Sequence, residues 1–95
     1  MFDRTFFERQ FLDCAQQFCR DHKIAAPVVE LLLDDGTAFR LRAIGLIKES
    51  WLSLSAHGER GEARVVLCPY FTIKRITFSA PGSPKDGTFA LPAAP

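Results

Sequence analysis

The spacing of hydrophobic residues changes once along the chain, from helical to strand-like. From about residue 5 to residue 23, apolar side chains recur three and four positions apart, as on one stripe of an amphipathic helix. The stripe consists of Phe7, Phe11, Cys14, Ala15 and Phe18. Thr5 followed by Glu8 matches a capping box and predicts the helix start, and Pro27 predicts an end near residues 22 and 23. Three more apolar residues widen the face, so we expect this helix to contact a second surface besides its own sheet. They are Phe6, Leu12 and Cys19.

From Val28 onward the period is that of β-strands. The run "VVELLLDDG" is rich in β-branched and aliphatic residues and ends at residues 34–36, where glycine favours a hairpin turn. The next run alternates until its phase slips around Gly45, which predicts a bulge or a sharp bend. Three further runs, "WLSLS", "RVVLC" and "FTIKRITFS", predict strands. Pro69 has no backbone donor, so it predicts a tight corner or an edge between the last two.

One helix followed by five short strands, the second long and bent, is typical of a small, strongly twisted barrel whose open end the helix caps. We therefore predict a mainly β protein with a single domain over residues 1–79, its helix at about 5–23 and its strands at about 28–79. The remainder, residues 80–95, is rich in proline, glycine and alanine and shows no period. We expect most of it to be flexible, with Phe89 and Leu91 as the residues able to dock.

Composition narrows the class of protein. Hydrophobic residues make up 47% of the 95 residues and charged residues 24%, as in an ordinary globular domain. A core this small is marginal unless a partner surface completes it, so a homo-oligomer is a reasonable expectation. The net charge of +1 gives no global attraction to nucleic acid, and any such contact would need a local basic patch.

The sequence also allows expectations about cellular location and cofactors. The first ten residues carry charges on both sides of their aromatics, and no run approaches the roughly 20 apolar residues of a membrane span. Three cysteines form no even framework and suggest reduced thiols, so we expect a cytoplasmic protein without membrane contact. His22 and His57 stand alone, and no serine has the context of an activated nucleophile. We expect no metal, no cofactor and no catalysis.

The order of these elements over about residues 5–79 resembles the Sm-like family, which includes the Hfq-like proteins. The best local match is to the first Sm-type motif. It comprises Val29, Leu31, Leu33, Asp35, Gly36, Ile44, Ile47, Leu52 and Leu54. The resemblance implies an SH3-like barrel whose copies close into a ring, with the fourth strand of one paired to the fifth of the next, and single-stranded RNA bound at the pore. It also implies an interface that includes Val65, Val66, Leu67 and Ile76.

The second motif departs from the family. Where Hfq-like members carry Tyr-Lys-His, this chain has Pro69, Tyr70 and Phe71, and the acidic position of the first motif falls near Lys48. The groups that read a base edge and hold a phosphate are thereby mostly replaced.

The candidate RNA-binding residues are therefore aromatic and basic. Tyr70 and Phe71 can stack on bases while Lys74 and Arg75 attract phosphates. The alternative is that Phe71 packs in the core or under the helix and Tyr70 caps the barrel mouth.

Two further groups are ambiguous. Arg40 and Arg42 form either a basic stripe or a solvated strand face. Lys48 and Trp51 flank a turn, and Trp51 is either a binding anchor or part of a subunit interface. Two hypotheses follow: a ring that binds single-stranded RNA, or a barrel without the nucleotide pocket that acts as a protein-interaction or assembly module.

Overall fold

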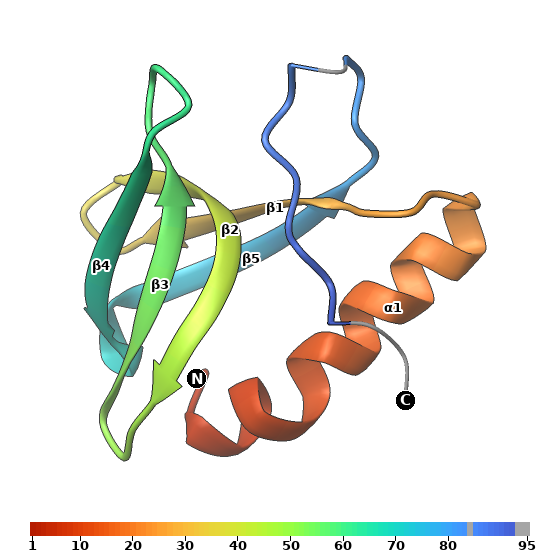
Figure 1. Ribbon diagram of the computed structural model, residues 1–95. Coiled ribbons are helices and arrows are strands. Elements are labelled where there is room, and N and C mark those ends of the chain that lie inside the picture. The colour runs from red at the N-terminus through yellow and green to blue at the C-terminus, as the bar shows by residue number, and fades with distance from the viewer. Residues whose placement is uncertain (84, 93–95) are drawn as a thin grey trace.

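The computed structural model, which describes residues 1–83 and 85–92, shows an N-terminal helix packed against a strongly bent five-stranded sheet (Figure 1). The helix begins with a π-helical turn, η1 (Phe6–Gln10), and continues as α1 (Phe11–His22); the strands are β1 (Val28–Leu33), β2 (Ala38–Ile47), β3 (Trp51–His57), β4 (Ala63–Pro69) and β5 (Ile73–Ser79), with the 3-10 helix η2 (Tyr70–Thr72) before β5. Every strand pair is antiparallel, in the order β4-β3-β2-β1-β5. The predicted fold class is confirmed, but the sheet is open, because β4 and β5 are its two edges and do not pair with each other.

The helix ends differ in how well they were predicted. Thr5 makes no side-chain cap; instead, the Phe6 N–H donates to Asp3 Oδ1 at 2.8 Å, and Glu8 pairs with Arg4. The predicted capping box is therefore wrong, although the start is close to the expected one. At the other end Lys23 adopts the left-handed conformation, and the N–H of the following residue bonds to the Cys19 carbonyl at 3.0 Å. This Schellman-type cap confirms the predicted end.

The hairpin turn at residues 34–36 is confirmed. Gly36 has a φ of 90°, and its N–H donates to the Leu33 carbonyl at 3.0 Å. Asp35 Oδ1 accepts the Thr37 N–H at 2.8 Å, which closes the turn. Because this hydrogen bond favours the charged carboxylate, it holds the pKa of Asp35 below its usual value.

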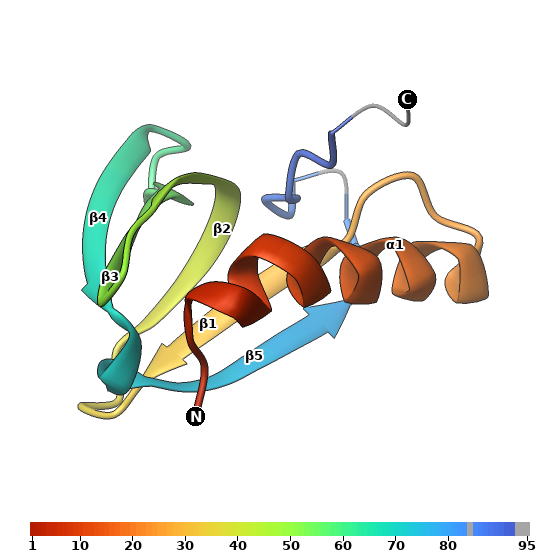
Figure 2. The same ribbon diagram turned by 90° about the horizontal axis from the view of Figure 1, so that it is seen from below.

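The bend in β2 lies where Gly45 predicted it. The first part of β2 pairs with β1 and its second part with β3, and the β2–β3 register shifts between Ile44 and Ile47. A Cβ on Gly45 would overlap Ser53 Oγ, which accepts the Leu46 N–H at 2.7 Å. A side chain at Gly45 would thus collide with the hydroxyl that holds the bend. Figure 2 shows the result: β1 and β5 run beneath α1, while β3 and β4 form a separate wall.

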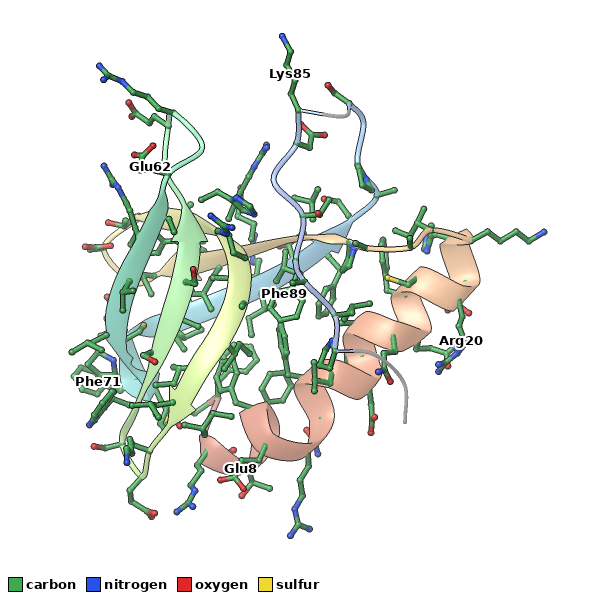
Figure 3. The ribbon with its side chains drawn as sticks, viewed as in Figure 1. Glu8, Arg20, Glu62, Phe71, Lys85 and Phe89 are labelled. Carbon is green, nitrogen blue, oxygen red and sulfur yellow. The ribbon has the colours of Figure 1, made fainter. Side chains whose placement is uncertain are left out.

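The C-terminal segment docks on the core through Phe89 and Leu91, the two residues expected to be able to do so. Phe89 is 2% exposed and lies between the helix and the sheet, where its ring meets Phe11 at 5.3 Å (Figure 3). The backbone N–H of Phe89 donates to the Pro27 carbonyl at 2.8 Å, and that of Ala90 to the Arg42 carbonyl at 2.7 Å. Leu91 packs against the same core. Residues 84 and 93–95 of the expected tail lie outside the described residues.

Candidate interaction surfaces

The corner between β4 and β5 is tied to the turn between β2 and β3. Tyr70 makes both connections: its N–H donates to the Ser50 carbonyl at 3.1 Å, and its hydroxyl donates to the Lys48 carbonyl at 2.7 Å. Within the corner, Thr72 Oγ1 donates to the Pro69 carbonyl at 2.8 Å. The predicted corner at Pro69 is confirmed, and it is a single 3-10 turn that docks on its neighbour.

The two adjacent aromatics of this corner point in opposite directions. Tyr70 is 5% exposed, and its ring stacks on Phe7 with a centroid distance of 5.7 Å. The Tyr70 ring is therefore not exposed for stacking on a base, and burial raises the pKa of its hydroxyl. Phe71 is 70% exposed and points away from the sheet (Figure 3), so it lies neither in the core nor under the helix. Of the two rings, that of Phe71 is the one left free to stack.

Phe71 belongs to a shallow apolar groove of about 370 Å³, which we call the apolar corner. It is lined by Ser50, Trp51, Leu67, Pro69 and Phe71. Trp51 is half-buried and lies opposite Pro69 across β3 and β4. Two aromatic rings and a proline around an open groove form a surface that can hold a planar or apolar group.

The outer face of β4 continues this apolar surface. Val65 and Leu67 are 76% and 65% exposed, because they pair with Ser55 and Ser53, which alternate with the buried leucines of β3. Val66 points to the inner face, opposite Leu54, and is half-buried. Within the described residues, the outer edge of β4 carries no strand. A free edge with large exposed aliphatic side chains favours pairing with another chain.

The predicted basic residues are not gathered in one patch. Lys74 and Arg75 are exposed on β5, Lys48 is exposed beside the apolar corner, and none of the three takes part in an ion pair among residues 1–83 and 85–92. Arg40 Nη1 lies 3.5 Å from Asp86 Oδ1, and Arg42 is half-buried beside the C-terminal segment. The expected Arg40–Arg42 stripe is thus partly neutralised and partly covered.

A second groove, of about 570 Å³, lies between α1 and β5, and we call it the helix groove. Its walls are the rings of Phe18 and Phe78, stacked with a centroid distance of 6.1 Å, and Asp13 and Asp21 lie on its rim. Ile76 is half-buried on the same face of β5. None of the groove's own residues was predicted as a site. The sequence feature that could have predicted the groove is the pair of aspartates eight positions apart, with Phe18 between them. This spacing puts all three residues on one side of a helix.

Charges of both signs line a cleft at the opposite end of the sheet. It measures about 570 Å³ and is bordered by Arg40, Arg64 and Lys85 together with Glu30 and Glu59. Its one imidazole, His57, donates from Nε2 to the Thr88 carbonyl at 2.9 Å and so holds the C-terminal segment. In the described part of the chain, no three His, Cys, Asp or Glu side chains are placed to hold a metal ion. No helix there has the length and apolarity to cross a membrane.

Comparisons with known proteins give no family for this chain, so a proposal about its function has to start from these surfaces. No protein-family model matches the chain, and neither a curated protein nor a solved structure matches it significantly.

Proposed function

We propose that this chain is a self-assembling Sm-like protein that joins the β4 edge of one copy to the β5 edge of the next. The observation that carries the proposal is the free edge of β4, where Val65 and Leu67 are 76% and 65% exposed. A contact between two different edges is head-to-tail, so it builds a ring if the rotation closes and a filament if it does not.

The two edges match in length and in side-chain pattern. Each strand has seven residues. Full antiparallel overlap places Val66 opposite Ile76, and these two half-buried residues both face inward. On the outer face the same register places Leu67 opposite Arg75, whose aliphatic stem can cover the leucine. The sheet would continue from copy to copy with its inner face unbroken.

One substitution at the edge tests assembly. Lysine on an edge strand disfavours pairing with another strand, and at Leu67 it would also face Arg75 of the neighbour. We expect Leu67→Lys to convert the assembly to monomers in sedimentation velocity, while circular dichroism shows a folded chain. Leu46→Lys is the matched control, because Leu46 is 59% exposed on β2, away from both edges. A wild-type protein that stays monomeric at every accessible concentration would contradict the proposal.

Single-stranded RNA is the second candidate function, favoured by the exposure of Phe71. An aromatic ring on a groove, with free cations near it, is the arrangement by which proteins stack and neutralise single strands. The backbone of Lys48 contacts the corner directly, and Lys74 follows Phe71 by three residues. In a ring, the same corner of every copy would repeat around the pore.

Fluorescence anisotropy with A-rich and U-rich RNA oligomers at low and physiological salt tests this function. Loss of one base stack is worth about 1–3 kcal/mol, so Phe71→Ala should weaken binding roughly 5- to 150-fold, whereas Phe71→Tyr should retain it. Lys74→Ala/Arg75→Ala should weaken binding and reduce its dependence on salt. If the assembled protein binds neither oligomer at low salt, RNA binding is excluded, and the chain is an assembly or protein-interaction module.

A further inference from the structure

We infer that Arg64 of one copy inserts into the helix groove of the next copy and fixes the register of the β4–β5 contact. This inference rests on the proposed assembly and adds a specific recognition element to it. Phe18, Phe78, Asp13 and Asp21 receive the guanidinium, and the occupant is a second copy of this chain. Four observations support this assignment.

The first observation is the side of the strand on which Arg64 lies. Arg64 pairs with Ala56, which is buried, so its side chain leaves β4 on the inner face. In the register of full overlap, Arg64 lies opposite Phe78 of the neighbour. Phe78 also points to the inner face, because it pairs with the buried Val29 of β1. Arg64 and the helix groove of the neighbour are thus on one face of the joined sheet.

The second observation is charge. The groove is bordered by two carboxylates, Asp13 and Asp21, and by one guanidinium, Arg20, so its lining carries a net charge of −1. Gln17 lies between the two signs of charge: its Oε1 accepts from Arg20 Nη2 at 2.8 Å, and its Nε2 donates to Asp21 Oδ1 at 2.7 Å, which leaves the second oxygen of Asp21 and both of Asp13 without a side-chain donor among the described residues. An incoming arginine therefore meets an acidic rim. Its planar group can also lie on the face of Phe78 in a cation–π contact.

The third observation is that Arg64 is poorly satisfied within its own chain. Its side chain is 60% exposed, and the nearest carboxylate oxygen, Glu62 Oε1, is 3.8 Å from its Nε. That distance is longer than a hydrogen bond. Arg64 is therefore free to exchange Glu62 for a better partner at small cost.

The fourth observation is that this contact cannot form within one copy. Both ribbon views place β4 on one side of the molecule and the C-terminal half of α1 on the other (Figures 1 and 2). Figure 3 shows the same separation between Glu62, on the loop before β4, and Arg20, at the end of α1. Arg64 therefore reaches a helix groove only by way of another copy.

Charge reversal on two separate chains provides the test. Arg64→Glu places like charges together at every contact, and so does Asp13→Lys/Asp21→Lys. We expect each variant alone to self-associate at least about tenfold more weakly than wild type in sedimentation velocity. In a mixture, every contact between the two variants is complementary, because the carboxylate introduced at position 64 of one chain meets two lysines, and the unchanged Arg64 of the other meets two aspartates. The mixture should therefore recover assembly with the two chains alternating.

Arg60→Glu is the matched control, since Arg60 is exposed in the loop before β4 and its replacement changes the net charge equally. Assembly of Arg64→Glu at wild-type strength, or failure of the mixture to recover, would overturn the inference. If Leu67→Lys dissociates the protein while Arg64→Glu does not, the β4–β5 contact stands without the arginine. A monomeric wild type removes both proposals together.

Discussion

The two edges of the sheet have opposite environments although one chain builds both. β5 is covered on its inner face by α1, whose Phe11 and Phe18 pack against Phe78 at centroid distances of 5.7 and 6.1 Å. β4 is covered by no helix among the described residues: Cys68 is its one buried side chain, and its outer side chains Val65 and Leu67 are left in solvent. The chain is short, and its helix and C-terminal segment cover only one half of the bent sheet. The contrast separates the residues that the chain buries in folding from those that it leaves exposed.

The largest effect is expected from removing an aromatic ring on the covered side. Phe89→Ala should lower the free energy of unfolding by about 3–5 kcal/mol, because it empties a fully buried site beside Phe11. Phe71→Ala, which removes the same ring from the uncovered corner, should change it by no more than about 0.5 kcal/mol. Urea denaturation in the Leu67→Lys background keeps assembly out of both values. Similar losses for the two variants would refute the contrast.

The next largest effect on stability is expected at the bend in β2, which separates the covered half of the sheet from the uncovered half. Gly45→Ala should destabilise the protein by about 1–3 kcal/mol, because the new Cβ would collide with Ser53 Oγ. Ser53→Ala alone loses the hydrogen bond to the Leu46 N–H. If the collision is the cause, the double variant should be clearly more stable than the sum of the two single losses predicts, as a double-mutant cycle would show.

The helix that covers β5 depends on its first turn. Asp3→Ala should cost about 0.5–2 kcal/mol through the loss of the cap on the Phe6 N–H, and Thr5→Ala should cost much less. Thermal unfolding of the two variants side by side measures the difference. Equal losses of stability in the two variants would show that Asp3 is not the dominant cap of the helix.

The smallest effect is expected at Asp35, which lies in the exposed turn between β1 and β2 and belongs to neither edge strand. Because its pKa is lowered in the folded state, the charged carboxylate adds stability above the pKa of the unfolded chain. That stability is lost as pH falls through the folded pKa. Asp35→Asn keeps an oxygen acceptor but does not titrate. The stability of wild type relative to Asp35→Asn should therefore decline from neutral pH to pH about 2.5 in urea titrations. A difference independent of pH would show that the charge contributes nothing.

The local rules of the sequence predicted the elements but not their long-range contacts. The turn at residues 34–36 and the bend at Gly45 were predictable, because glycine is required at the site itself. Whether Tyr70 or Phe71 turns inward depends on one 3-10 turn docking on the Ser50 and Lys48 carbonyls, which no periodicity records. Phe89 is a single aromatic residue in a segment without period. Its burial depends on a contact with Phe11, which is far away in the sequence. Thr5 is already in the right-handed helical conformation, so Asp3 makes the cap, and Glu8 pairs with Arg4.

The place of Phe89 in the core also bears on the order in which the protein folds as it is synthesised. The aromatic face of α1 leaves the ribosome first, and the last ring that completes its cover follows only after all five strands. Until Phe89 is made, that face lacks its last cover, and the Arg42 carbonyl of β2 lacks the Ala90 N–H that it accepts in the folded chain. A core that includes Phe89 can therefore form only after residues 1–88 have been synthesised.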